Sequence, residues 1–193
     1  VQMDNQSNRM EALVADLLLL ARLEGTEADS VRQAVPVHGM LNRMKDNALA
    51  ISSDKHHRIE LDVPLDARLI ANPAELESAF GNLITNAVKY TPAEGTIHIR
   101  WWQDAHGAHL SVTDDGIGID PAHIPRLTER FYRPDNSRVT QTGGTGLGLA
   151  IVKHVMIRHN GRLEITSELS KGSTFTCHFP ADRLVSKPTA VAG

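Results

Sequence analysis

The sequence predicts an α+β domain: a two-layer sandwich of one mixed β-sheet and about three helices, preceded by one separate helix. Two kinds of pattern carry this prediction. Apolar residues recur at helical spacing in some segments and alternate with polar residues in others, and the alternating segments come mostly in pairs around short polar turns. A chain that mixes such hairpins with helices packs the helices on one face of a sheet.

The composition excludes several classes of protein. With 41% apolar residues, the chain can bury a substantial core, which is mainly aliphatic because only 4% of residues are aromatic. The net charge of −3 offers no basic field for a nucleic acid. No apolar run reaches the roughly 18–20 residues of a membrane span. The single cysteine, Cys177, excludes an internal disulfide and favours a reducing compartment.

Residues 1–24 are predicted to form one helix. Two series of residues have heptad spacing, and all but Gln6 are apolar: Met3, Met10 and Leu17, and Gln6, Leu13 and Leu20. Two interpretations of this stripe stay open: it packs on the rest of the chain, or it joins partner helices in a bundle, which would be dimeric. Residues 25–35 are polar and aperiodic, so we expect a linker there.

The middle of the chain alternates helices and strands. The pattern predicts a helix that begins near residue 40 and ends near 56–57, followed by strands over 59–63 and 69–71. Asn72 is then expected to cap a helix that has Pro73 as its first residue and ends at Tyr90.

The remaining elements complete a domain over 36–183. We expect strands over 95–103 and 108–114, a short helix over 121–131, a mobile polar loop over 134–142, a helix over 147–159, and strands over 162–166 and 173–179. The small, polar residues 184–193 are predicted to be a flexible tail.

The helix that ends at Tyr90 carries polar side chains on one face. Asn82, Asn86 and Lys89 follow one another at helical spacing, and the opposite face is apolar. An Asn oxygen is a hard, neutral ligand for Mg²⁺, and a nearby lysine can contact phosphates as a point charge. Taken alone, the pattern also fits an ordinary solvated helix face.

Two glycine-containing segments add to this. In the first, Asp114 ends a strand and is followed by Gly116 and Gly118, which allow close backbone approach. Such a carboxylate can accept a hydrogen bond from an exocyclic amine such as that of adenine, although a tight turn uses the same residue types. In the second, residues 143–149 open a helix with free backbone N–H groups, which form an anion site. The preceding loop could fold over a nucleotide.

In this order, the segments resemble the nucleotide-binding motifs of sensor histidine kinases. Residues 82–92 resemble the N box, 114–119 the G1 box, 129–133 the F box, 144–149 the G2 box and 171–175 the closing hairpin. Residues 1–24 resemble the second helix of the dimerisation and histidine-phosphotransfer domain. The resemblance covers all but the tail and implies the Bergerat type of ATP-binding fold.

The resemblance implies a role for each matching position. Asn86 would hold Mg²⁺, and Asn82, Lys89 and Arg133 would complete the catalytic set at the metal and the phosphates. Asp114 would read adenine. The other implied nucleotide-binding residues are Tyr90, Gly116, Gly118, Ile119, Gly144, Thr145, Gly146, Leu147, Gly148 and Leu149. The pattern departs at Asp115, where the family usually has Asn, and the exchange adds negative charge near the pocket.

The same resemblance implies the reaction and the partners. ATP would give its γ-phosphoryl group to a histidine of an H box, for relay to a response regulator. None of the ten histidines lies in an H-box context, so we expect the acceptor helix to lie outside this chain. The parent is expected to be a homodimer anchored in the bacterial inner membrane, with this part in the cytoplasm.

Two other classes of function remain as alternatives: an ATP-hydrolysing clamp, as in type II topoisomerases, mismatch-repair proteins and heat-shock chaperones, and a nucleotide-regulated interaction module. The clamps place a Glu one helical turn before the metal-binding Asn to activate water. Here that position is Asn82, which cannot act as a base. Positioning and charge neutralisation are the main needs of phosphoryl transfer, so the residues favour a kinase.

Overall fold

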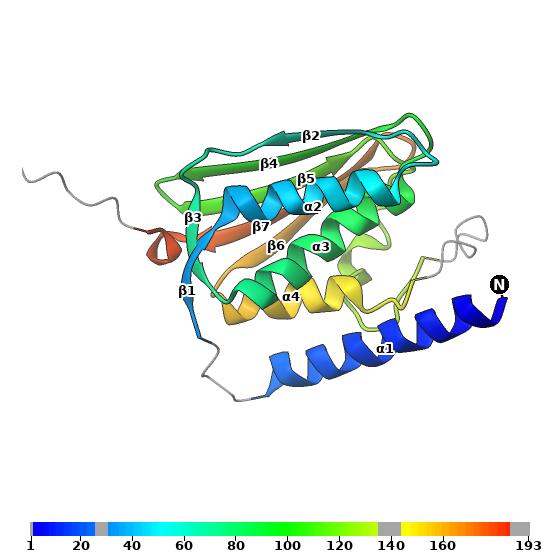
Figure 1. Ribbon diagram of the computed structural model, residues 1–193, viewed down its shortest axis with the longest axis horizontal. Coiled ribbons are helices and arrows are strands. Elements are labelled where there is room, and N and C mark those ends of the chain that lie inside the picture. Colours follow the sequence, from blue (N-terminus) through cyan, green and yellow to red (C-terminus); the bar gives the residue numbers. More distant parts are fainter. Residues whose placement is uncertain (1, 26–30, 135–143, 186–193) are drawn as a thin grey trace, which may run out of the picture.

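The computed structural model describes residues 2–25, 31–134 and 144–185. Within them a five-stranded sheet forms one layer and the helices form the other (Figure 1). The strands are, in spatial order, β2 (Arg58–Asp62), β4 (Thr96–Asp104), β5 (Gly107–Asp114), β7 (Gly172–Pro180) and β6 (Arg162–Glu168). β2 runs parallel to β4 and the other pairs are antiparallel, so the predicted mixed sheet and both predicted hairpins are confirmed.

Three helices cover one face of this sheet: α2 (Val37–Ile51), α3 (Pro73–Tyr90) and α4 (Gly148–Arg158). The predicted cap of α3 is present, because the Asn72 side chain accepts the Glu75 backbone N–H at 3.1 Å. The aromatic side chain of Phe80, on the buried face of α3, packs edge-on against Trp101 of β4 and Phe179 of β7. This contact fixes α3 on the sheet, and its polar face is left to line the site.

The predicted linker over 25–35 is wrong in its last part. Gln33–Pro36 form strand β1, which pairs antiparallel with β3 (Arg68–Ala71) in a separate two-stranded sheet. Val35, at 2% exposure, is the one residue of β1 that is buried. A four-residue strand with a single apolar contact has no local periodicity, and its partner is more than thirty positions away in the chain. Residues 26–30 lie outside the described residues.

The predicted helix over 121–131 is also wrong. This segment forms a series of turns around one 3₁₀ turn, η1 (Ile124–Arg126). Pro125 has no N–H to donate and so cannot continue an α-helical ladder. The turns close instead with short-range bonds such as Leu127 N–H to the Ile124 carbonyl at 3.3 Å.

Two predicted flexible segments fall largely outside the described residues. These are the loop over 134–142, of which only Pro134 is described, and the tail over 184–193, of which 184 and 185 are described. After the 3₁₀ turn η3 (Ala181–Arg183), Leu184 forms an isolated β-bridge with Leu69 and packs against the core. The domain therefore continues past residue 183, where it was predicted to end, to include Leu184.

The first helix, α1 (Gln2–Glu24), is confirmed and lies beside α4 (Figure 1). Its last turns pack on the domain, where Leu20 and Leu23 are 1% and 5% exposed. Further back, Met10 and Val14 are exposed, so part of the apolar stripe is not covered by the described residues. Packing on the domain thus accounts for the end of α1, and the bundle stays a prediction. No helix of the described residues is long and apolar enough to cross a membrane.

Candidate functional site

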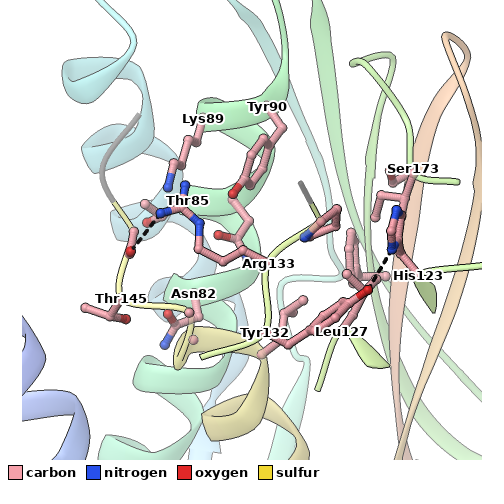
Figure 2. Close-up of a pocket in the computed structure, with 18 of the residues that line it drawn as sticks. Asn82, Thr85, Lys89, Tyr90, His123, Leu127, Tyr132, Arg133, Thr145 and Ser173 are labelled. Carbon is pink, nitrogen blue, oxygen red and sulfur yellow. Dashed lines mark hydrogen bonds between the residues drawn. The ribbon is translucent and has the colours of Figure 1, made fainter. Parts of the chain in front are cut away.

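A cavity of about 720 Å³ lies between α3, the turn after β5 and the segment that leads into α4 (Figure 2). It contains side chains from every predicted motif. All but two of the predicted site residues line it, the exceptions being Gly116 and Leu147. Motifs that are separated by tens of residues in the sequence therefore meet at one place in the fold.

The α3 wall presents Asn82 toward the glycine-rich segment. The Asn82 Nδ2 group donates to the Ser78 carbonyl at 2.9 Å, so that the side-chain Oδ1 atom faces the other way. A Cβ atom on Gly148 would stand 2.4 Å from that oxygen. Glycine at the first position of α4 therefore lets the two walls approach, and Asn86 lines the same cavity one turn further along α3.

Two cationic side chains, those of Lys89 and Arg133, meet at the end of the cavity formed by Gly144. The position of a Cβ atom on Gly144 would be 2.5 Å from the Lys89 Nζ atom, and Arg133 Nη1 lies 3.5 Å from the Gly144 carbonyl. Figure 2 shows Lys89 and Arg133 side by side, with Thr145 and Asn82 below them. Converging ammonium and guanidinium groups beside open backbone form an anion site.

The position of Lys89 and Tyr90 depends on a lysine that the sequence did not reveal. Lys55, in the turn after α2, donates from Nζ at 2.9 Å to the carbonyls of Val88, Lys89 and Thr91. His57 adds contacts from Nε2 to the carbonyls of Thr91 and Pro92 at 3.0 and 2.9 Å. These groups donate to carbonyls at and just after the C-terminal end of α3, and the positive charge of Lys55 interacts favourably with the negative end of the helix dipole. A lysine in a polar turn gives no local signal of this contact.

Asp114, which is 7% exposed, lines the cavity beside its strand partner Ser173, and Figure 2 shows Ser173 across the site from Lys89. Its carboxylate accepts the Gly116 N–H at 2.9 Å and a backbone N–H from Ser173. Burial raises the pKa of Asp114 above its ordinary value of 3.8, and the charge of Asp115 raises it further against the lowering effect of the two hydrogen bonds. Gly116 thus acts behind Asp114 and does not line the cavity.

Asp115 has a structural contact. Its side chain is exposed and accepts the Thr96 N–H at 2.8 Å, at the point where β4 begins. An Asn oxygen can accept the same bond, so the departure from the usual Asn leaves this contact available. Asp115 does not line the cavity.

The segment before α4 is held by backbone contacts. Gly146 has a φ of +73°, a conformation that favours glycine, and its carbonyl accepts the Phe131 N–H at 2.9 Å. Leu147, predicted to bind nucleotide, is fully buried in the core instead. It anchors the start of α4, which leaves the neighbouring Gly146 and Gly148 at the cavity.

Several lining residues were missed. His123 and Tyr132 form a hydrogen-bonded pair, with Nδ1 and the hydroxyl oxygen 2.6 Å apart, and the Arg126 guanidinium lies 4.1 Å from the Tyr132 ring centre. Also missed were Thr85, Ile117, Asp120, Leu127, Pro134, Ser173 and Phe175, and Ala12 and Asp16 of α1. Thr85, Ile117, Tyr132, Ser173 and Phe175 lie within the predicted motifs but were not assigned a role, the other residues carry no motif, and only the packing of α1 brings its residues here.

Three of the ten histidines, none of which has an H-box context, make contacts within the fold. The His159 Nδ1 atom lies 2.8 Å from the Val155 carbonyl, and His154 lies 3.2 Å from the Glu24 carboxylate. His38 contacts the Asn42 amide one turn along α2. None of these side chains lines the cavity.

Comparisons with known proteins point to one family. The family described as histidine kinase-, DNA gyrase B-, and HSP90-like ATPase matches residues 71–183. The phosphate regulon sensor protein PhoR of Pseudomonas aeruginosa is 60% identical over 178 residues, which are 92% of this chain and 40% of that protein. The protein of the same name from Haemophilus influenzae is 40% identical, over 96% of this chain and 43% of its own length.

Solved structures agree. Full-length ShkA in complex with AMPPNP superposes with a TM-score of 0.80 at 25% identity, over 97% of this chain and 39% of that chain. The mycobacterial sensor histidine kinase MprB superposes with a TM-score of 0.66 at 28% identity, over 80% of this chain and 100% of that chain. The chain spans about two fifths of the length of the curated relatives it matches.

Proposed function

We propose a function from one premise: this chain belongs to the histidine kinase-, DNA gyrase B-, and HSP90-like ATPases and is the ATP-binding catalytic part of a sensor histidine kinase. In this proposal the chain holds Mg-ATP in the cavity and gives the γ-phosphoryl group to a histidine of an H box. The observation that supports this is the polarity of the cavity. Lys89, Arg133 and the Gly144–Gly148 backbone gather at one end, and the buried Asp114 carboxylate lies beside its strand partner Ser173, which Figure 2 shows across the site from Lys89.

Each end fits one part of ATP. The two cations and the start of α4 favour the polyphosphate, because both the side-chain charges and the helix N-terminus attract anions. Asp114, as a buried acceptor, favours the exocyclic amine of adenine, and Ile119 and Leu149 give apolar surface in the cavity for the ring. Tyr90, Gly118 and Thr145 also line the cavity.

The donor set fits Mg²⁺ held jointly with the nucleotide. Asn86 and Asn82 offer neutral side-chain oxygens, and Mg²⁺ prefers oxygen ligands while it keeps several waters and binds phosphates. Within the part of the chain that the structure describes, no group of three or more His, Cys, Asp or Glu could hold a metal. The ion would therefore depend on phosphate oxygens, and bound there it would neutralise phosphate charge.

The same residues favour transfer over hydrolysis. Asn82, one turn before Asn86, carries an amide and cannot take a proton from water. Glu75, further back on α3, is bound to Arg158 at 3.0 Å and does not line the cavity. Lys89 and Arg133 would position the phosphates and stabilise their negative charge while an imidazole attacks the γ-phosphate.

The wider setting of this proposal rests on the relatives. By resemblance to the phosphate regulon sensor proteins, we propose a PhoB-like response regulator as the final acceptor and a homodimeric parent anchored in the inner membrane, with this part on the cytoplasmic side. The exposed apolar residues of α1, Met10 and Val14 among them, fit its role as the second helix of a dimerisation bundle.

The decisive experiment mixes this chain with a separately produced H-box helix domain and γ-labelled ATP with magnesium. Label should appear on the H-box domain, and neither on this chain alone nor on an H-box domain whose acceptor histidine is replaced by glutamine. Steady release of phosphate without any transfer would favour a clamp ATPase. Binding of ATP with neither transfer nor hydrolysis would favour an interaction module.

A further inference from the structure

Helix α1 forms part of the cavity wall, although it lies far from every nucleotide motif in the sequence. Ala12 and Asp16 line the cavity, and α1 lies along α4 (Figure 1). Figure 2 shows Thr145 on the side of the site where α1 passes. The docked helix therefore takes part in shaping the place where a nucleotide would bind.

The contact is a hydrogen bond between α1 and the glycine-rich segment. The Thr145 hydroxyl donates to Asp16 Oδ2 at 2.8 Å, and the same hydroxyl oxygen accepts the Leu147 N–H at 3.2 Å. The single hydroxyl proton of Thr145 is thus committed to Asp16. The neighbouring residue, Gly144, is the one that lies against Lys89 and Arg133, so Asp16 stands at the cationic end of the cavity.

The last turns of α1 hold Asp16 in this place. Leu20 and Leu23 are buried, and the Glu24 carboxylate pairs with Arg130. Arg158 of α4 donates to the Leu23 carbonyl at 3.4 Å. These contacts begin about one helical turn after Asp16, at Leu20, and end about two turns after it, at Glu24, so the carboxylate is positioned by a helix that is anchored at its C-terminal end.

We propose that Asp16 is a residue of the nucleotide site that discriminates against the γ-phosphate when α1 is docked. The inference rests on the proposed function, because it takes the Lys89 end of the cavity as the phosphate end. A carboxylate there repels a polyphosphate, and the repulsion is greater for ATP than for ADP because ATP carries one more charged phosphate. The Thr145 hydroxyl is also withheld from the phosphate oxygens while Asp16 accepts its proton.

The consequence is a coupling between nucleotide and helix. If docked α1 weakens ATP binding, bound ATP must weaken the docking of α1 by the same factor. The arrangement described above is then the one that the ADP-bound or empty site favours. ATP shifts the population toward chains in which Asp16 has left the cavity.

The test titrates the 193-residue chain with ATP and with ADP, each with excess magnesium, and compares it with Asp16→Asn. We expect the variant to bind ATP about three- to tenfold more tightly and ADP less than about twofold, with a gain that shrinks at high salt. Glu11→Gln is the matched control, since Glu11 is an exposed carboxylate of the same helix that does not line the cavity. It should leave both affinities unchanged.

A second variant separates a local contact from a general charge effect. In a Thr145→Val background the bond that holds Asp16 over the cavity is absent, so Asp16→Asn should change the ATP affinity by less than it does alone. Equal effects of Asp16→Asn on ATP and ADP, or no effect on either, would overturn the inference and leave the proposed function standing. Failure of the unaltered chain to bind Mg-ATP would overturn both.

Discussion

The side-chain oxygen of Asn82 lies 2.4 Å from the point where residue 148 would place a Cβ atom, and that residue is glycine. The Asn82 amide nitrogen is bound to the Ser78 carbonyl, which keeps the oxygen turned toward Gly148. Because residue 148 has no Cβ atom, the α3 wall and the start of α4 can approach each other closely at this point. The position of the Asn82 oxygen depends on a residue in another motif, sixty-six positions away.

Gly148→Ala should therefore weaken nucleotide binding with little effect on folding. The added methyl group meets the end of a side chain, so Asn82 can turn away and the free energy of unfolding should change by about 1 kcal/mol or less. The displaced oxygen no longer serves the metal and phosphates, and we expect the Mg-ATP affinity to fall about tenfold by titration calorimetry.

Gly81→Ala is the matched control. Gly81 also lies in a helix, α3, and a Cβ atom there would meet nothing within 4 Å. This change should raise the free energy of unfolding by about 0.5–1 kcal/mol and leave nucleotide affinity unaltered. If Gly148→Ala folds and binds Mg-ATP as tightly as the Gly81 variant, the placement of the Asn82 oxygen does not matter for binding.

Asn86→Ala tests the proposed metal ligand. Without the Asn86 oxygen, the affinity for ATP in the presence of magnesium should fall about tenfold, while the weaker binding without magnesium should stay nearly the same. Asn47→Ala on the exposed surface of α2 serves as the control. Equal losses with and without magnesium would assign Asn86 to the nucleotide and not to the metal.

How much of the fold the sequence predicts depends on whether the information is local. The cap formed by Asn72 and Pro73 and the alternation in both hairpins are local signals, and those elements are confirmed. Strand β1 is held by Val35 against a distant partner, which no window of the sequence contains. The helix predicted over 121–131 is wrong because Pro125 has no N–H for an α-helical ladder, and the segment forms a 3₁₀ turn there instead.

The site follows the same division. Motif residues such as Asn82, Asp114 and Gly148 were predicted to gather, and the cavity brings them together. Lys55 and Asp16 were missed because each acts through a tertiary contact, one with the end of α3 and one with Thr145. Their residue types and spacing are those of any solvated lysine or aspartate.

Asp114→Asn should separate stability from nucleotide selectivity. Because the folded chain raises the pKa of Asp114 above 3.8, the folded state binds the proton more tightly, and stability falls as pH rises from 3.8 through the raised pKa. Above that pKa, Asp114 is fully ionised in the folded state, and its burial lowers the free energy of unfolding by the full amount. Asn removes it, so urea unfolding should show a more stable variant at pH 7, with a difference that shrinks toward pH 3.8.

The same variant should lose its preference for ATP over GTP, because a carboxylate that accepts from the adenine amine is replaced by an amide that can donate. Asp115→Asn is the control: it keeps an acceptor for the Thr96 N–H and lies outside the cavity, so selectivity should not change. An unaltered ATP preference in Asp114→Asn would remove Asp114 from adenine recognition.

Lys55→Met tests whether the end of α3 is fixed from outside the cavity. The methionine fills similar space but cannot donate to the three carbonyls that Lys55 contacts, so the free energy of unfolding should fall by about 1–3 kcal/mol. Loosening of Lys89 and Tyr90 should also lower the Mg-ATP affinity, by about three- to tenfold, although Lys55 does not line the cavity. Lys153→Met, at an exposed lysine of α4, should change neither quantity by more than a small amount. A Lys55 variant that unfolds more easily but binds Mg-ATP normally would show that the side chains of Lys89 and Tyr90 are positioned by the cavity itself and not by the cap of their helix.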